Sequence, residues 1–380
     1  MCYNEIMAGV NIRPNVNKTV FSWAISRAGL TENDALKSYP QFTQWESGEI
    51  SATVKQLKDF SQKFHFPFGY FFLNSIPEQS TTIPMFRSFE ETTATEDFNV
   101  QEFIKILSER QTWAAEYLKE NGAEKNEAVG RYKTEDDVKT IKNGILSFFD
   151  LSDGWQLSFK KPEEAIKHIV SLLEENNIFV TFNSVVNFDV HRPISIKLCR
   201  GFCLVDDYAP FIFINSSDSK KAQLFTLIHE IAHIFISFSS GYGDFGIEEI
   251  GNSKERLCDR IAAEFLVPTD LFIENSQASS NEELSAMYKA SEIVILRRKL
   301  ECGLISKEVF FAMYNQLPKF HKNNSGGGDF YLAAPNRIGR KLLRCLNNAM
   351  MERKLTPLEV YHLAGVKGDT FAKLTSGALS

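Results

Sequence analysis

FTLIHEIAHIF, residues 225–235, places two histidines and a glutamate inside an otherwise apolar run. Four residues along an α-helix correspond to about 40° around the axis and about 6 Å along it, so His229 and His233 would project from one face. Two ring nitrogens at that spacing can reach one zinc ion at about 2.0–2.1 Å. Glu230 would lie beside the ion, where its carboxylate can take a proton from an attacking water.

The alternative is a core helix that carries these polar residues without a metal. Residues 219–237 are predicted to be helical, because Ser217 or Ser219 can cap the start and apolar side chains recur at helical spacing. A dry core does not readily accept two histidines and a carboxylate, since each buried polar group needs a partner. One metal ion satisfies all three groups. The pattern therefore predicts a zinc site, with one ion per chain.

The motif by itself leaves zinc one ligand short, because catalytic zinc takes three protein ligands and a water. Acidic and histidine side chains that follow the motif could supply the third ligand: Asp244, Glu248, Glu249, Glu255 and His321.

The segment KERLCDRIAAEFLVP, residues 254–268, favours Glu255 among these candidates. Its apolar residues show helical spacing and Pro268 ends it, so a second helix packed beside the first could present Glu255 to the metal. Asp259, one turn later, could bind the far nitrogen of one histidine and orient the ring. Spacing alone also allows Glu255 to be a solvated acid at a helix start. Glu264 faces elsewhere on this helix and is expected to be structural or a surface charge.

The remaining sequence predicts three parts. Residues 1–78 form short helices, with one helix ending at Gly48 and the next capped by Ser51 or Thr53. Residues 79–320 combine helices with strand-like runs at 177–182, 194–198, 202–205 and 211–215. This order favours an α+β domain with a small antiparallel or mixed sheet. Residues 321–380 begin with the linker HKNNSGGGD and continue as a basic helical domain.

Composition narrows the class of protein. The chain of 380 residues has 43% hydrophobic and 24% charged residues, as folded soluble proteins do. We expect no contact with membranes, because no run of about 18 apolar residues occurs, and a cytoplasmic location, because the N-terminus lacks a secretion signal. Six scattered cysteines favour reduced thiols over a disulfide framework. Cys199 and Cys203 could instead hold a structural zinc, but no second pair stands at zinc-finger spacing.

Three segments together resemble the ImmA/IrrE family of zinc metallo-endopeptidases: PFIFIN, then FTLIHEIAH, then ERLCDRIAAEFLVP. The resemblance covers about residues 80–300. It implies a zincin-like fold of the gluzincin type, with His229, His233 and Glu255 as the zinc ligands and Glu230 as the catalytic glutamate. Cys258 stands where alanine is more usual in the family. Asp259 stands where asparagine is frequent, and both changes leave the chemistry intact.

The resemblance also implies narrow proteolysis of a repressor-like or antitoxin-like regulatory protein inside bacterial cells. The sequence agrees with peptide hydrolysis, because FIFIN at 211–215 directly precedes the motif helix and could be an edge strand that pairs with an extended substrate. A nearby donor would stabilise the oxyanion. The candidates for that donor are Tyr208, Tyr242, His191 and His321.

The N-terminal part resembles the helix-turn-helix module (XRE/Cro type) that precedes the peptidase in long family members. The matching residues are WESGE followed by TVKQLKDFSQKFHFPFGYFFL, whereas ALKSYPQFTQ is shortened and lacks the usual glycine. Residues 1–80 hold seven basic and seven acidic residues, and this neutral balance argues against strong phosphate binding. A domain that contacts the protein substrate or covers the cleft is the alternative.

The C-terminal tail has a helix-turn-helix-like pattern of its own, in which a helix begins at Thr356 and Pro357 and ends at Gly365. Residues 331–380 hold eight basic residues against three acidic ones. Arg340, Lys341 and Arg344 are candidate contacts for DNA or for an acidic partner, and a solvated helical surface is the plainer interpretation.

Two rival functions therefore stand beside the peptidase. The first is a DNA-binding regulator or antitoxin whose zincin-fold domain recognises a toxin encoded nearby, with little or no hydrolysis. The second is a zinc-stabilised scaffold. Glu230 argues against the scaffold, because a structural site needs no general base.

Overall fold

The computed structural model describes residues 12–28, 30–64, 66, 68–76, 94–236, 248–317 and 329–378. Contacts divide the described chain into two compact units, the first ending at Gln101 and the second running on from Glu102. Helix α5, Ala94–Glu120, spans this boundary. No helix among the described residues has the length and apolarity needed to cross a membrane.

The first unit is a bundle of short helices with an aromatic core. Its helices are α1 (Thr19–Arg27), α2 (Glu32–Ser38), α3 (Phe42–Ser47), α4 (Val54–Lys63) and the 3-10 helix η1 (Phe68–Phe72). Gly48 ends α3 in the left-handed conformation (φ 81°), as predicted. Thr53 caps α4 in a capping box with Gln56, so Thr53 rather than Ser51 is the cap.

The second unit contains a three-stranded mixed sheet in the order β1-β3-β2. Strand β1 (Phe179–Asn183) pairs parallel to β3 (Phe211–Asn215), with Phe179 opposite Phe211. Strand β2 (Gly201–Leu204) pairs antiparallel to β3, with Gly201 opposite Ile214. The prediction of a small mixed sheet is confirmed.

Two expectations about the strands are wrong. FIFIN (211–215) is not an edge strand: it is β3, paired on both sides and buried along its whole length, as befits its apolar side chains on both faces. Residues 194–198 form a turn rather than a strand. The buried amide of Asn215 explains this turn, because it donates to the carbonyls of both Ile194 and Cys199 at 2.9 Å and folds the segment back.

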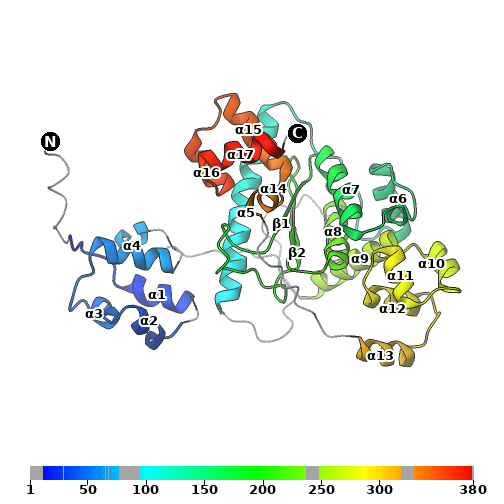
Figure 1. Ribbon diagram of the computed structural model, residues 1–380, viewed down its shortest axis with the longest axis horizontal. Helices are drawn as coiled ribbons and strands as arrows, with labels where there is room; N and C mark the ends of the chain where they lie inside the picture. The colour runs from blue at the N-terminus through cyan, green and yellow to red at the C-terminus, as the bar shows by residue number, and fades with distance from the viewer. Residues whose placement is uncertain are drawn as a thin grey trace. The chain divides into compact units, whose positions relative to one another are not determined.

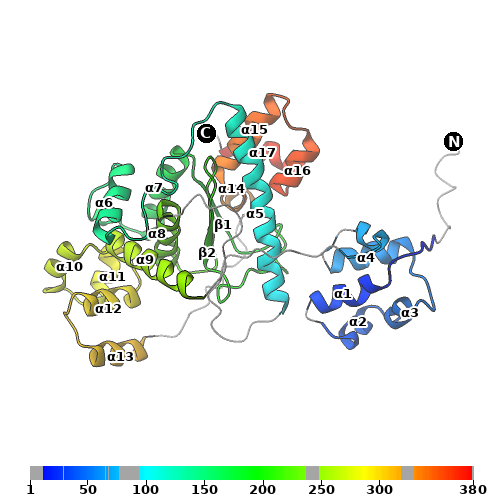
Figure 2. The ribbon, with the colours of Figure 1, turned by 180° about the vertical axis from the view of Figure 1, so that it is seen from behind.

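Helices cover both faces of the sheet (Figures 1 and 2). On one face α8 (Lys220–Ile236) contacts β2 and β3, and α7 (Pro162–Glu175) contacts β1. Behind α8 lie α6 (Val138–Phe148) and α9 (Glu248–Leu266), followed along the chain by α10 (Thr269–Ser276), α11 (Asn281–Tyr288), α12 (Glu292–Glu301) and α13 (Lys307–Gln316). On the other face α5 places Phe103 against Phe213, with ring centroids 4.8 Å apart.

The C-terminal helices pack on the same sheet and form no third unit among the described residues. They are α14 (Phe330–Ile338), α15 (Arg340–Met351), α16 (Pro357–Ala364) and α17 (Gly368–Ala378). Helices α14 and α15 contact β1. The Thr181 hydroxyl of β1 donates to the carbonyl of Arg337 at 2.6 Å. This part of the basic tail is thus integral to the unit that contains the HExxH helix.

Candidate metal centre

Helix α8 carries the HEIAH motif on a largely buried segment. Its apolar side chains Leu224, Leu227, Ile228, Ile231 and Ile234 are fully buried in the main core, so the helix is fixed against the sheet. His229 and His233 lie one turn apart on the remaining face, with side chains 12% and 22% exposed. The helix predicted for residues 219–237 is therefore present, and both imidazoles reach the same place.

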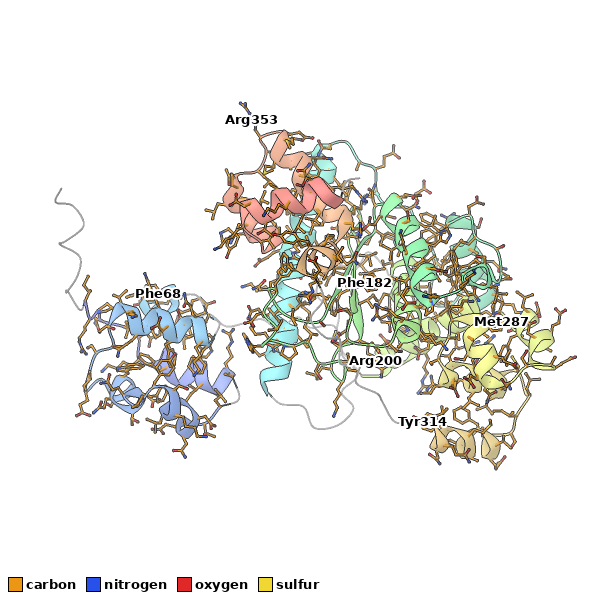
Figure 3. All side chains as sticks on the ribbon, viewed as in Figure 1. Phe68, Phe182, Arg200, Met287, Tyr314 and Arg353 are labelled. Carbon is orange, nitrogen blue, oxygen red and sulfur yellow. The ribbon has the colours of Figure 1, made fainter. Side chains whose placement is uncertain are left out.

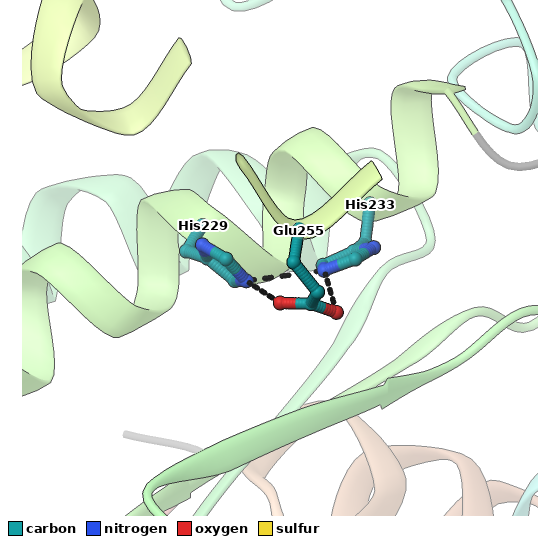
Figure 4. A group of neighbouring side chains, drawn as sticks. All are labelled: His229, His233 and Glu255. Atoms are coloured by element: carbon teal, nitrogen blue, oxygen red, sulfur yellow. Dashed lines mark hydrogen bonds and ion pairs between the residues drawn. The ribbon is translucent and has the colours of Figure 1, made fainter. Parts of the chain in front are cut away.

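Helix α9 packs along α8 and brings Glu255 to the two histidines (Figure 4). The Nε2 atoms of His229 and His233 are 3.1 Å apart. The two carboxylate oxygens of Glu255 lie 3.2 Å from one Nε2 each.

These separations test whether the donors fit a metal. Ligand atoms about 2.0–2.1 Å from a tetrahedral zinc lie ~3.3 Å from one another. The three side chains match that spacing closely. Two imidazole nitrogens and a carboxylate are also a donor set that zinc accepts. The arrangement fits a zinc ion held by His229, His233 and Glu255.

Asp259 lies behind the first histidine. Its Oδ1 atom is 3.0 Å from Nδ1 of His229, on the far side of the ring from the other histidine. A carboxylate at this position keeps the proton on Nδ1 and leaves the Nε2 lone pair facing the centre. This is the contact that the sequence predicted for Asp259.

The charges of the centre are strongly coupled. Burial by itself lowers the pKa of His229, but the hydrogen bonds to Asp259 and Glu255 outweigh it and raise this pKa to about 10. Burial acts to raise the pKa of Glu255, but the hydrogen bonds to both histidines lower it well below its usual range. The centre therefore favours a bound positive charge, which a proton or a metal cation can supply.

Glu230 is buried beside this cluster, with 6% of its surface exposed. Burial is the main cause that raises its pKa above the usual value, while the nearby histidines act in the opposite direction. The thiol of Cys203, on β2, donates a hydrogen bond to the Glu230 carboxylate. The sequence did not predict this contact, because it joins two residues 27 positions apart across the sheet–helix interface.

Other candidates from the sequence lie elsewhere. Lys119 Nζ is 4.6 Å from the ring centre of Tyr208, and the backbone of His191 donates to Asp189 at 2.9 Å. Within the described part of the chain, neither Tyr208 nor His191 has an interaction with His229, His233 or Glu255. Glu264 binds Arg298 at 2.6 Å in a buried ion pair, consistent with the structural role expected for it.

Five other sequence candidates have side chains that lie outside the described part of the structure. Tyr242, Asp244 and His321 lie outside the described residues, and Glu248 and Glu249 lie where only the backbone of α9 is described. The three candidate contact residues of the tail are described, and all three bind within the molecule. Arg340 donates to Asn336 at 3.1 Å, Arg344 pairs with Glu174 at 2.7 Å, and Lys341 donates to the Glu174 carbonyl at 2.6 Å.

The described cysteines Cys199, Cys203, Cys258, Cys302 and Cys345 are all free thiols, as expected. Cys199 donates to the carbonyl of Gly201, and Cys203 to Glu230. These contacts give no support to a zinc site built on that pair.

Comparison with protein families agrees with the geometry. Residues 174–299 match the Peptidase_M78 family, described as an IrrE N-terminal-like domain. The match runs from the end of α7 to α12, so it contains the whole sheet and all residues of the centre. It supports the ImmA/IrrE resemblance and a metallopeptidase-like function. Searches of curated proteins and of solved structures return no significant match.

Proposed function

We propose that the protein is a zinc-dependent endopeptidase. The observation that carries this proposal is that the donor atoms of His229, His233 and Glu255 lie 3.1–3.2 Å apart. The buried carboxylate of Glu230, which follows His229 on α8, lies beside them. A purely structural zinc site would be closed by a fourth protein ligand and would need no acid beside it. Among the described residues, only these three side chains form a candidate metal-binding group.

Each side chain has a separate task in this proposal. His229, His233 and Glu255 hold the ion, and Asp259 keeps the His229 ring oriented. Bound zinc would polarise the scissile carbonyl and lower the pKa of water to about 7. Glu230 accepts the proton of the attacking water and returns it to the leaving amine. Its raised pKa suits this exchange, since a base works best when its pKa lies near the working pH.

Strand β2 is the proposed place for the substrate backbone. It is an edge of the described sheet, and its residue Cys203 contacts Glu230. An extended peptide that adds to this edge by main-chain hydrogen bonds would lie next to the centre. This role was expected of FIFIN, but β3 is already paired on both sides. We propose a repressor-like or antitoxin-like regulatory protein with an exposed extended segment as the substrate.

Three substitutions test the proposal. Glu230→Gln should retain about one zinc per chain and lose cleavage, because the amide cannot accept the proton. His229→Ala and Glu255→Ala should lose the metal itself. Glu274→Gln, an exposed acid on α10, is the matched control and should change neither property. Metal content is measured by mass spectrometry, and cleavage by incubation with the products of neighbouring genes, with and without chelator.

The results separate the proposal from its rival. Equal cleavage by Glu230→Gln and the unchanged protein would remove Glu230 from the mechanism. Stable binding of a toxin-like neighbour, without chelator-sensitive cleavage of any neighbour, would favour the recognition module over the peptidase.

A further inference from the structure

Helices α16 and α17 are joined by a short turn, Gly365-Val366-Lys367. Gly365 adopts the left-handed conformation (φ 76°), which lets the chain reverse direction directly after α16. Thr356 and Glu359 form a capping box that fixes the start of α16. Helices α15, α16 and α17 contact one another in all three pairs. Two helices joined by a three-residue turn that contains glycine, supported by a third helix, form the helix-turn-helix arrangement.

The arrangement is rigidly attached to the sheet unit. Arg110, on α5, is buried and donates from Nε to the carbonyl of Leu363 at 2.7 Å and from Nη2 to that of Ala364 at 3.4 Å. A cation at this position satisfies the last carbonyls of α16 and suits the negative end of its dipole. Burial lowers the pKa of Arg110 to about 10, so the guanidinium remains charged at neutral pH. The α16 end of the turn is thus fixed to α5.

One face of α17 is open. Asp369, Ala372, Lys373 and Ser376 are exposed and recur at the spacing of a single helical stripe. The opposite stripe, Phe371, Leu374 and Thr375, is buried. Three of the four exposed side chains are short, so the helix backbone can approach a partner surface closely. The stripe carries one acid, Asp369, at its first turn and one base, Lys373, in its middle. A helix with a narrow open stripe of mostly short side chains has the shape that a DNA major groove admits.

Three cations of this helical group are exposed, two of them at or within α17. Lys367 immediately precedes α17, Lys373 lies within the stripe, and Arg353 projects outward from the α15–α16 connection (Figure 3). Part of the positive charge of the tail is used internally, because Glu174 binds Arg344 and Glu352 binds Lys354. Among the described residues, Lys367 and Arg353 form no ion pair, so their charges remain available to an anionic partner.

We propose that α15–α17 bind double-stranded DNA, with α17 in the major groove and Lys367, Lys373 and Arg353 against phosphates. This proposal is independent of the peptidase. It assigns DNA binding to the end of the chain opposite the N-terminal module that resembles known helix-turn-helix domains. In that module the corresponding helix, α3 (FTQWES), carries no cation and is followed by Glu49.

Fluorescence anisotropy of the full chain with a labelled 30-base-pair duplex tests the proposal. Three phosphate contacts predict that affinity falls about 40-fold between 50 and 200 mM salt. Lys367→Ala with Lys373→Ala should weaken binding at least tenfold and reduce the salt slope by about two. The matched control is Lys55→Ala with Lys58→Ala on α4. Both of these lysines are exposed, and Lys58 lies over Phe68 at 5.8 Å much as Lys373 lies over Tyr331 at 5.9 Å.

A second variant guards against misfolding. Ala372→Glu adds an acid to the open stripe without touching the core, so it should abolish binding while the thermal unfolding curve is unchanged. Glu230→Gln should bind the duplex as well as the unchanged chain does, which separates this test from the peptidase.

Three outcomes would overturn the proposal. They are no duplex binding at 50 mM salt, an equal loss in the α4 control, and equal affinity for polyglutamate and DNA, which would indicate an acidic protein partner.

Discussion

The N-terminal helices α1–η1 and the C-terminal helices α14–α17 use the same local devices and are stabilised in different ways. Both contain short helices, capping boxes and a glycine in the left-handed conformation at a helix end. The N-terminal helices bury a cluster of their own, rich in aromatic rings: Phe21, Phe42, Trp45, Phe60, Phe64, Phe66 and Phe71. The C-terminal helices bury mainly aliphatic side chains and contact β1, which belongs to the sheet.

Polar contacts make the difference sharper. Three side chains of the sheet unit, Arg110, Glu174 and Thr181, bind backbone or charged groups of the C-terminal helices. A segment with its own aromatic cluster can fold alone, because each large ring contributes about 1.5–3 kcal/mol on burial. A segment that depends on partners far away in sequence cannot. A similar pattern of short helices thus forms an independent unit at the N-terminal end and an integral part of the sheet unit at the C-terminal end.

Deleting each region in turn should show the largest effect. Removal of residues 329–380 uncovers β1, which α14 and α15 contact, and takes away the groups that Arg110 and Glu174 bind. We expect this truncated chain to lose metal binding and its main thermal transition. Removal of residues 1–76 should leave both in place. Equal metal content in the two truncated proteins would contradict the claim that only the C-terminal helices are integral to the sheet unit.

Phe60→Ala should destabilise only the N-terminal unit, by about 3–5 kcal/mol. Phe60 is fully buried and its ring contacts seven other aromatic rings, so no neighbour can easily fill the cavity. Phe72→Ala is the control, because Phe72 is 49% exposed. Denaturant unfolding and metal content are the measurements. A loss of metal binding in Phe60→Ala would show that the two units are not independent.

Glu174→Gln should loosen the C-terminal helices, with a cost of about 1–3 kcal/mol to the sheet unit. The amide keeps the shape of the side chain but removes the charge that faces Arg344, whose partial exposure screens the pair. Glu175→Gln, on the next residue, is the control. Hydrogen exchange of α15 amides should rise in the first variant alone, and unchanged protection would remove Glu174 as an anchor.

The smallest expected effect concerns pH, and here both regions should behave alike. Hydrogen bonds from Lys37 and Thr31 lower the pKa of Asp34 to about 2, and hydrogen bonds from Thr356 lower the pKa of Glu359. A lowered pKa stabilises the folded state above the usual pKa, and that contribution is lost as pH falls through the folded value. The Thr53–Gln56 box carries no charge and should not respond. NMR titration of the two carboxyls should give values below those of free side chains, and unshifted values would show open caps.

Local spacing predicted part of the centre, and the choice of Glu255 as the third ligand rested on the family resemblance. A helix repeats every 3.6 residues, so HEIAH alone places His229 and His233 on one face, and ERLCDRIAAEFLVP alone predicts a helix with Glu255 and Asp259 one turn apart. The packing of α9 against α8 then brings the four together. The same local logic correctly predicted Gly48 as a helix end, and it left Ser51 and Thr53 as candidate caps for the next helix, of which Thr53 is the cap.

Strand order was not predictable in the same way. FIFIN has the composition of a strand wherever it lies in a sheet, and only its pairing with β1 and β2 makes it central. Residues 194–198 have strand-forming side chains as well, but the amide of Asn215 holds them in a turn. Each outcome depends on contacts beyond one helical turn, with β1 and β2 for FIFIN and with Asn215 for residues 194–198.

The amino-acid order thus established the helices, their caps and the face that gathers the histidines, since these follow from interactions within a few residues. Folding in three dimensions established which strand lies at the edge, that Cys203 contacts Glu230, and that Lys341 and Arg344 bind Glu174. Those features depend on contacts between distant segments, whose geometry no local periodicity encodes.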